Sequence, residues 1–433
     1  MDLSQEISKE SGVDDCLVKI YASDGYGSPD IVREIIHYEH PDLILLITDP
    51  RFFGWFAPME HELKTVHKIK LCYLNIWDNL IFPHYNSSMY ASMDLLMSIN
   101  RQTKVINQEV LKYHGTKTVD IDKNPAEPNS TLLAYLPHGL NPKNFFKETE
   151  ESHDYAAFQE FQANFKKQHP ETEFIVFFNS RNIRRKQPGD VILAYKRFCD
   201  QLSKEDAKKC CLLMKTQIQD ENGTDLMAVK KAICPKYKIL FNQDNIPTQV
   251  LNWFYNISDC TIFMSSAEGF GLAGNESLLS ETILIAPVTG GLQDQMRFED
   301  ENGKWIEFDE EFTTNHRGKY KKCGEWALPI FPRTRQLQGS IPTPYIFDDC
   351  SDAQDGADRI MEVWLMSKEE RERRGRSGRE WAMGEESGMS SPEMAKRFIK
   401  SVDTLLETWT PPEKFTLRKV EPRKVIENSG IQW

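Results

Sequence analysis

Short apolar runs alternate with amphipathic segments through the first third of the chain. The apolar runs have the length and near-continuous hydrophobicity of buried strands, and they occupy residues 17–23, 42–49, 69–76, 95–99 and 132–136. After the first run, Ser28 as an N-cap and Pro29 at the first helical position predict the start of an amphipathic helix. Buried strands separated by helices predict a parallel sheet that is covered on both faces.

A polar stretch at residues 142–172 interrupts this pattern, which then resumes with greater regularity. Further strands, with helices between them, are predicted at residues 173–179, 210–216, 238–243, 260–266 and 283–289. This order is typical of a second doubly wound α/β unit. Ligands of such open sheets bind beyond the carboxyl ends of the strands, so we expect the chemistry in the loops that follow them.

The chain is long enough for two domains, because 433 residues exceed what one hydrophobic core usually supports. Residues 1–140 are expected to form an N-terminal Rossmann-like domain, and residues 141–172 an interdomain segment. Residues 173–395 are expected to form the second domain, and residues 396–433 a C-terminal helix and tail that packs on the surface. Residues 299–345 are expected to be an elaboration near the mouth of a cleft, either a lid or a platform.

Charge and composition exclude several classes of protein. A formal charge of −12 argues against bulk nucleic-acid binding, which requires many Lys and Arg side chains to neutralise phosphates. Nine cysteines without C-x-x-C pairs indicate reduced thiols rather than a disulfide framework. The polar N-terminus does not resemble a signal peptide, and no apolar run approaches the roughly 18 residues of a transmembrane segment. We therefore expect a cytoplasmic protein.

The most informative stretch surrounds the end of the predicted strand at residues 260–266. Glu268 is expected in the strand-end loop, and Glu276 follows it after seven residues, in the first turn of the next helix. The small residues between them leave backbone N–H groups free to approach a ligand, and the N-terminus of a helix favours anionic oxygens. Such a loop can hold a phosphorylated sugar.

A second signal lies in the loop after the first strand of the same domain. Arg181 and Lys186 stand in this loop, which opens on the same edge of the sheet as Glu268. Two cations that face a glycine-rich helix start could hold a diphosphate, with Arg as a planar fork and Lys as a point charge. Arg184 and Arg185, between them, are as consistent with surface charge as with a role in the site.

These segments resemble the family-4 retaining glycosyltransferases of the GT-B fold. The resemblance rests on the E-x7-E segment, on the R-x5-K segment before it, and on the later Gly290-Gly291 pair. It runs from residue 42 to about residue 380 and is densest over residues 174–296. It implies an α/β protein with two Rossmann-like, doubly wound domains that face a cleft, with the acceptor on the first domain and a nucleotide-sugar donor on the second.

The resemblance also implies roles for individual residues. Arg181 and Lys186 would contact the donor diphosphate, Glu268 would touch hydroxyls of the transferred sugar, and Glu276 would hold the nucleotide ribose. The loop that lines the sugar and phosphate site would consist of Gly269, Phe270, Gly271 and Leu272.

The first domain departs from the family in two ways. Many members carry a histidine there that faces the donor sugar, whereas this chain offers Asn75, Asp78 or His84, of which we expect Asp78 to take the role. The His138-Gly139 step matches the family's approach to the interdomain linker. The domain also starts late compared with the family, so residues 17–28 replace the usual strand and glycine-rich loop, or the domain is truncated.

The resemblance implies a retaining hexosyltransferase that needs no metal and no cofactor, because cations and helix dipoles stabilise the leaving group. The acceptor is left open as a glycan, a lipid or another molecule. One alternative is a catalytically silent GT-B scaffold that binds a nucleotide. A less favoured alternative is an NAD-dependent oxidoreductase, because residues 269–274 spell G-x-G-x-x-G and Asp294 follows about twenty residues later. That fingerprint, however, belongs after the first strand of its unit and here follows the fourth.

Overall fold

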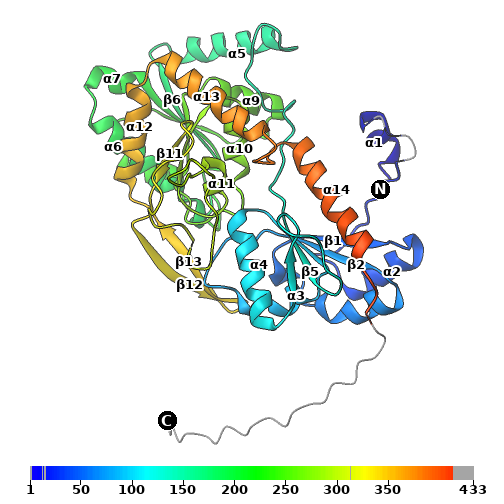
Figure 1. Cartoon of the computed structure of the whole chain (residues 1–433). Helices are drawn as coiled ribbons and strands as arrows, with labels where there is room; N and C mark the ends of the chain where they lie inside the picture. Colours follow the sequence, from blue (N-terminus) through cyan, green and yellow to red (C-terminus); the bar gives the residue numbers. More distant parts are fainter. Residues whose placement is uncertain (1, 12, 14–15, 313, 413–433) are drawn as a thin grey trace, which may run out of the picture.

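The computed structural model describes residues 2–11, 13, 16–312 and 314–412, and Figure 1 shows its two α/β domains. The N-terminal domain is built on a parallel five-stranded sheet with the strand order β1-β2-β3-β5-β4. Its strands are β1 (Leu43–Thr48), β2 (Lys70–Asn75), β3 (Leu95–Ser98), β4 (Thr118–Asp120) and β5 (Thr131–Tyr135). Four of the five predicted strands are therefore confirmed, and β4 was not predicted.

The predicted strand at residues 17–23 is wrong. This segment has no ladder partner except an isolated bridge between Asp2 and Lys19, and the Leu17 side chain is 65% exposed. An apolar run becomes a strand only when its backbone pairs with a neighbouring strand, and this run does not join the sheet, in which β1 is an edge strand. The helix start that follows is confirmed, because the Ser28 Oγ accepts a hydrogen bond from the Ile31 amide at the start of α2 (Pro29–Glu39).

The other helical elements of the N-terminal domain pack around its sheet or lie near its edge. The α-helices are α1 (Ser4–Ser11), α3 (Ser87–Ala91) and α4 (Arg101–His114). Short 3-10 and π turns join them and comprise η1 (Pro50–Phe52), η2 (Ala57–Met59), η3 (Glu62–Val66) and η4 (His84–Asn86). Residues of α4 contribute to a core cluster that contains Tyr73 and Leu96 of the sheet, so this face is well covered.

The C-terminal domain is built on a parallel six-stranded sheet with the order β11-β10-β9-β6-β7-β8. Its strands are β6 (Phe174–Asn179), β7 (Cys210–Lys215), β8 (Ile239–Asn242), β9 (Cys260–Ile262), β10 (Ile283–Pro287) and β11 (Ala327–Ile330). The first five match the predicted strands, whereas β11 lies in the segment that we expected to be an elaboration. Strand order reverses between β6 and β9, and the loops after these two strands carry the predicted motifs.

Helices cover both faces of this sheet, as a doubly wound fold requires. One core cluster joins the sheet to α6 (Pro188–Asp200), α8 (Leu226–Ile233) and α12 (Ala353–Leu365). The other joins it to α9 (Thr248–Asn256), α10 (Leu272–Leu279), α11 (Leu292–Met296) and α13 (Lys368–Met383). The short elements α7 (Lys204–Lys209) and η5 (Arg184–Lys186) complete the domain.

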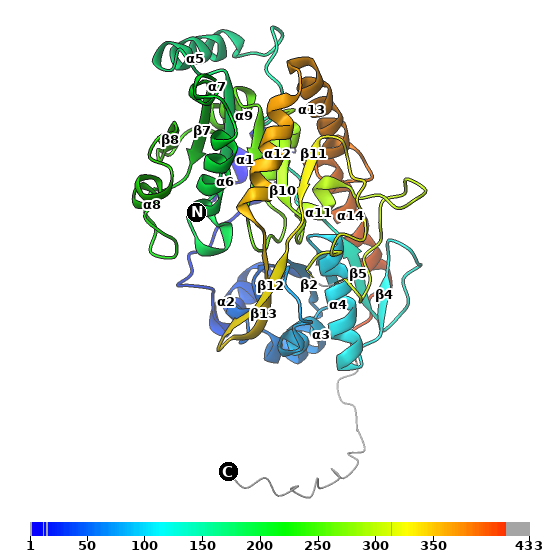
Figure 2. The same ribbon diagram turned by 90° about the vertical axis from the view of Figure 1, so that its left-hand side faces the viewer.

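Two segments pass between the domains side by side. Residues near Leu140 lead out of the first domain, and residues near Ser390 lead back, where the two segments form a parallel bridge. The outgoing segment contains α5 (Tyr155–Gln168), whose Phe161 packs on Trp253 of the C-terminal domain. The returning segment continues into α14 (Ser391–Thr408), which packs against β3 and β5 (Figure 2). The tail predicted beyond α14 lies outside the described residues from residue 413 onward.

A β-hairpin outside both sheets also contacts both domains. Its strands β12 (Thr334–Ser340) and β13 (Thr343–Cys350) are antiparallel. At its base, the Asp349 amide donates a hydrogen bond to the Ser266 carbonyl of the C-terminal domain at 3.0 Å. Further along, the Phe347 amide donates to the Leu80 carbonyl of the N-terminal domain at 2.6 Å. In Figures 1 and 2 the hairpin runs from one domain to the other.

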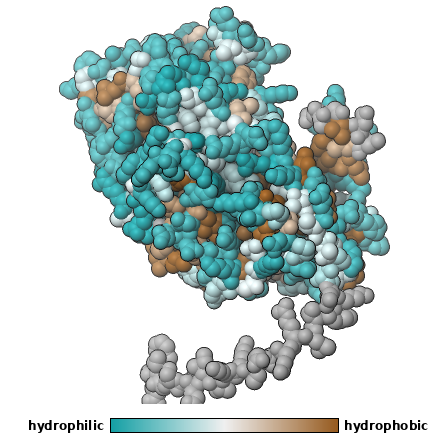
Figure 3. Space-filling model, in the orientation of Figure 1, coloured by the Kyte–Doolittle hydropathy of each residue, from teal (hydrophilic) through white to brown (hydrophobic). Residues whose placement is uncertain are grey.

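The polar surface and the unpaired cysteines agree with what the amino-acid composition indicates. Figure 3 shows a face that is largely hydrophilic, with small hydrophobic patches. All nine cysteines are free. Among the described residues, no helix is both long enough and apolar enough to cross a membrane.

Candidate functional site

A cleft of about 690 Å³ lies between the two domains, at the carboxyl ends of β2, β6 and β9. The hairpin provides part of its lining. Eight of the nine predicted site residues line this cleft, namely Asp78, Lys186, Glu268, Gly269, Phe270, Gly271, Leu272 and Glu276. The structure therefore brings together motifs that lie up to about two hundred residues apart, as expected from loops at the same sheet edge.

Glu268 is the centre of a buried charge cluster. Its side chain follows β9 and is 3% exposed, and its two carboxylate oxygens lie 2.5 and 2.6 Å from the Lys186 Nζ. The Arg185 Nη1 lies 3.3 Å from the same carboxylate. Burial opposes the ionisation of Glu268, but attraction to Lys186 and Arg185 outweighs burial and holds its pKa below the usual value. Burial also lowers the pKa of Lys186. The attraction of Lys186 to Glu268 partly offsets this lowering.

The backbone fixes these cations in place. Residues 184–186 form the single turn η5, and Pro188 then starts α6. The Ser266 amide donates a hydrogen bond to the Arg185 carbonyl at 2.8 Å, which ties this turn to the loop after β9. The two predicted motifs are thus joined through their backbones as well as through their side chains.

The loop from Gly269 to α10 is shaped by close backbone packing. Gly271 has a left-handed backbone with φ of 86°, and no side chain caps the N-terminus of α10. Uncapped amides at a helix start can bind anionic oxygens. A Cβ at Gly290 would lie 2.0 Å from the Glu268 carbonyl, and one at Gly291 would lie 2.4 Å from the Gly269 carbonyl. This close approach explains the glycine pair at these positions.

Glu276 in α10 is held by two neutral donors. Its Oε2 accepts hydrogen bonds from the Tyr255 hydroxyl at 2.6 Å and from the Asn179 Nδ2 at 3.0 Å. Burial raises its pKa, and the two hydrogen bonds partly offset this effect. Neither Asn179 nor Tyr255 was predicted as a site residue. Asn179 ends β6 and lines the cleft, whereas Tyr255 belongs to α9.

Arg181 is the one predicted site residue that does not line the cleft. Its Nε lies 2.8 Å from the Asp220 carboxylate, and its side chain is 60% exposed. Asp220 therefore competes for this guanidinium and holds it outside the lining of the cleft. Arg185, for which the sequence favoured neither surface charge nor a role in the site, lies beside Glu268 instead.

On the opposite wall, Asp78 is the member of the predicted trio that lines the cleft. Burial raises its pKa to about 6, an effect that Arg185 reduces and Glu268 reinforces. Asn75 instead donates from its Nδ2 to the Asn107 Oδ1 in the core of the N-terminal domain. The His84 ring lies against Tyr113, with a centroid distance of 3.9 Å.

Direct contacts hold the two domains together beside the cleft. The Asn100 Nδ2 donates a hydrogen bond to the Gly269 carbonyl at 2.7 Å, and a Cβ at Gly269 would lie 2.8 Å from the Ile76 carbonyl. The His138 ring packs edge-on against Phe270 at 5.7 Å, and burial lowers the pKa of His138. The loop at residues 269–271 is therefore in direct contact with the N-terminal domain.

Asp294 does not complete a dinucleotide site. Its side chain is fully buried, and its Oδ2 accepts a hydrogen bond from the Arg101 amide at 2.9 Å. It does not line the cleft, so it is not placed to hold the ribose of a ligand bound there. Within residues 2–412, apart from the undescribed positions, no group of three or more His, Cys, Asp or Glu side chains is arranged to hold a metal ion.

The comparison with protein families matches a central segment of the chain. The sequence model of the family described as "Glycosyl transferases group 1" matches residues 159–313, a segment that includes both predicted motifs. This segment is about a third of the chain. Among curated proteins, none matches this chain.

Solved structures match almost the whole chain. A trehalose 6-phosphate synthase from Burkholderia multivorans has a TM-score of 0.61 at 12% identity, with coverage of 87% of this chain and 75% of that one. A sucrose-phosphate synthase from Thermosynechococcus elongatus has a TM-score of 0.58 at 15% identity, with coverage of 87% and 77%. The Anabaena protein HepE, solved with UDP and glucose, has a TM-score of 0.59 at 11% identity, with coverage of 93% and 89%. The predicted fold is confirmed: the chain has a GT-B architecture of two Rossmann-like domains.

Proposed function

We propose that the protein is a glycosyltransferase that moves a sugar from a nucleotide-sugar donor to an acceptor hydroxyl, with retention of anomeric configuration and without a metal. The observation that carries this proposal is the buried cluster of Glu268, Lys186 and Arg185 beside the uncapped start of α10. The family match to the same segment and the GT-B fold support it.

Each part of the donor has a matching group on the C-terminal wall. Lys186, Arg185 and the first amides of α10 would bind the diphosphate, because they combine positive charge with N–H donors. Glu268 would accept hydrogen bonds from sugar hydroxyls, and Glu276 from the ribose. Arg181 would leave its ion pair with Asp220 and bind the diphosphate instead, since the diphosphate, like Asp220, is an anion. HepE and a trehalose-6-phosphate protein from E. coli were solved with UDP and UDP-2-fluoro glucose, so a UDP-sugar is the first donor to test.

The proposed reaction needs charge stabilisation and positioning. The bond between the anomeric carbon and the diphosphate oxygen breaks, and the acceptor oxygen bonds to the same face of that carbon. The acceptor proton passes to the departing phosphate, so the products are the glycoside and the protonated nucleoside diphosphate. Lys186 and Arg185 would stabilise the negative charge that develops on the leaving group, which is often the largest contribution to such catalysis. Asp78 would orient the donor sugar or the acceptor from the opposite wall.

The test is transfer from UDP-sugars to a library of acceptors, with NMR of the anomeric proton in the product. We expect a product with the anomeric configuration of the donor, at a rate unchanged by EDTA. An inverted product would contradict retention, and loss of activity with EDTA that added Mg²⁺ or Mn²⁺ restores would contradict metal independence.

The catalytically silent scaffold is distinguished by the same assay. A silent scaffold would bind the nucleotide but release no sugar, either to an acceptor or to water. Measurable donor hydrolysis that disappears in a Glu268→Gln variant with unchanged thermal stability would favour the enzyme. A cytoplasmic location remains a prediction, which fractionation of the source cells would test.

A further inference from the structure

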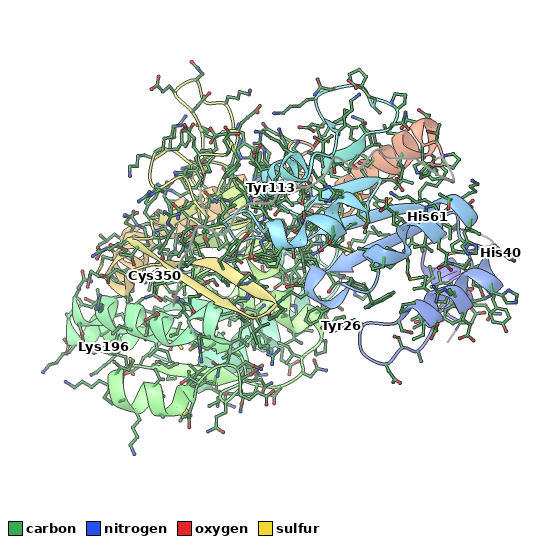
Figure 4. The ribbon with its side chains drawn as sticks, turned by 90° about the horizontal axis from the view of Figure 1, so that it is seen from below. Tyr26, His40, His61, Tyr113, Lys196 and Cys350 are labelled. Carbon is green, nitrogen blue, oxygen red and sulfur yellow. The ribbon has the colours of Figure 1, made fainter. Side chains whose placement is uncertain are left out.

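The hairpin forms part of the cleft wall, beside the loop that follows β9. Thr343, Ile346 and Asp348 of β13 line the cleft. Ile346 and Asp348 are two residues apart on one strand and so share a face of it. In Figure 4 the hairpin is the yellow ribbon that ends near Cys350 and lies between the green C-terminal and the blue N-terminal elements.

The hairpin is anchored on both domains, so this wall is held in place. Near the N-terminal domain, the Asn79 Nδ2 donates to the Phe347 carbonyl at 2.7 Å, and the Tyr85 hydroxyl donates to the Tyr345 carbonyl at 3.1 Å. At the base, the Asp349 carboxylate is buried and accepts hydrogen bonds from Thr289, Thr314 and Asn315. Asp348 therefore stands on a strand that is fixed immediately before and after it.

The charges that line the cleft do not balance. The acidic members are Asp49, Asp78, Glu268, Glu276 and Asp348, and the basic members are Arg51, Arg184, Arg185 and Lys186. Five carboxylates against four cations give a formal charge of −1 when all are ionised. A bound donor diphosphate adds further negative charge, so the occupied cleft is distinctly acidic.

Apart from the turn after β6 and the loop and helix after β9, the lining carries three carboxylates, Asp49, Asp78 and Asp348, but only one cation, Arg51. Three of the four cations come from the turn after β6, where the diphosphate would bind. On the opposite wall, the Arg51 guanidinium is engaged by Asp49, with its Nε at 2.9 Å and its Nη2 at 2.7 Å from the same oxygen. In the described part of the chain, neither Asp78 nor Asp348 forms an ion pair within 4 Å. Asp348 accepts a hydrogen bond from the Ser266 hydroxyl at 3.3 Å.

We infer that the acceptor carries no phosphate beside its reacting hydroxyl and is instead a neutral polyol or an amine-bearing molecule. This inference rests on the proposed function. Ionised carboxylates accept hydrogen bonds from hydroxyl and ammonium groups and repel phosphates. Asp348 and Asp78 would hold such groups from the hairpin and from the loop after β2, and Asp348 would select the acceptor.

The test compares matched acceptors that are neutral, amine-bearing or phosphorylated, each offered with the same UDP-sugar donor. For the wild type, we expect the phosphorylated members to have a kcat/KM at least about tenfold lower than their neutral counterparts, because like charges oppose binding. In an Asp348→Lys variant the preference should shift toward phosphorylated acceptors by about tenfold or more. An Asp348→Asn variant should lie between the two. Asp403→Asn serves as the control matched to Asp348→Asn, because it removes one negative charge from an exposed position in α14. It should leave the preference unchanged.

Donor binding is measured separately by titration with UDP. Intact UDP binding together with a wild-type preference for phosphorylated acceptors would overturn this inference and leave the proposed function standing. An Asp348→Lys variant that folds, binds UDP and keeps the wild-type preference would also overturn it. Failure of the wild type to bind any nucleoside diphosphate would instead overturn the proposed function.

Discussion

Glu268 on the C-terminal wall of the cleft and the carboxylates of the opposite wall, formed by the N-terminal domain and the hairpin, are held in different ways. On the C-terminal wall, Glu268 is buried against Lys186 and Arg185, and its pKa stays below the usual value because these cations outweigh the effect of burial. On the opposite wall, burial dominates at both Asp78 and Asp348, and it raises the pKa of each, that of Asp78 to about 6.

The difference shows which carboxylates have a fixed ionisation state before a ligand binds. Glu268 is ionised and fixed at neutral pH, so its part of the C-terminal wall is preorganised, whereas burial raises the pKa of Glu276 on the same wall. Asp78 ionises close to the physiological range, so the opposite wall responds to pH and to whatever binds there. Under the proposed function, the fixed charge of Glu268 would serve donor binding, and the pH-sensitive charge of Asp78 would act on the donor sugar or the acceptor.

The largest expected effect comes from breaking the buried pair on the donor wall. Lys186→Met should lower kcat/KM by about a thousandfold, because it removes the cation nearest the leaving group. It should also lower the free energy of unfolding by about 3–5 kcal/mol, because Glu268 remains buried without its closest cation. Steady-state kinetics and urea denaturation measure the two effects.

A double variant separates these two effects. Lys186→Met combined with Glu268→Gln should recover much of the stability, because no unpaired charge remains, but it should not recover activity. A single Lys186→Met variant that keeps the wild-type kcat/KM would show that the cluster has only a structural role.

A smaller effect is expected at the ribose end of the same wall. Glu276→Gln should raise the KM for the donor by about ten- to a hundredfold, the range of a hydrogen bond to a charged group. The value of kcat should change much less. Tyr255→Phe removes a hydrogen bond to Glu276 without altering the lining charge, and it should have a lesser effect in the same direction. An unchanged donor KM in Glu276→Gln would argue against ribose binding.

Asp78 tests the pH response of the opposite wall. Its ionised form is the proposed hydrogen-bond acceptor, so wild-type kcat/KM should rise as pH increases through about 6. Asp78→Asn should lack this acidic limb and should be about tenfold less active above it. Its raised pKa means that the folded state holds the proton more tightly than the unfolded state, so its contribution to stability should fall as pH rises from about 4 to 6. An identical pH profile in the variant would remove Asp78 from the mechanism.

The smallest expected effect concerns the pair that holds Arg181 away from the cleft. Asp220→Asn should raise donor affinity by up to about fivefold, because an exposed ion pair is worth at most about 1 kcal/mol and its loss frees Arg181. Arg181→Ala should abolish this gain in the double variant. Reduced donor affinity in Asp220→Asn would mean that Asp220 supports the site rather than competing for Arg181.

The donor wall could be predicted from the sequence because it consists of local motifs. Glu268, the glycine-rich loop and Glu276 lie within nine residues, and the strand-and-helix pattern places Lys186 at the same sheet edge. The pattern does not predict which side chain of the loop after β6 points toward Glu268. Arg185, rather than Arg181, meets Glu268 because a single helical turn orients it.

The opposite wall could not be predicted in the same way. Its contacts join Asn79 to Phe347, which are 268 residues apart, and no spacing rule connects them. Residues 334–350 carry many exposed polar side chains and do not show the alternation of a half-buried strand, although they form a hairpin. Residues 17–23 show the converse, since this apolar run joins neither sheet and forms no strand.

Calorimetric titration of UDP, GDP, ADP and NAD tests the central claim most directly. The titrations are made on the wild type and on a folded Lys186→Ala, Glu276→Ala double variant, with a chelator present. The account predicts that the wild type binds one nucleoside diphosphate tightly, that the double variant does not, and that the chelator has no effect. Binding of NAD alone, or of no nucleotide by well-folded wild-type protein, would contradict it.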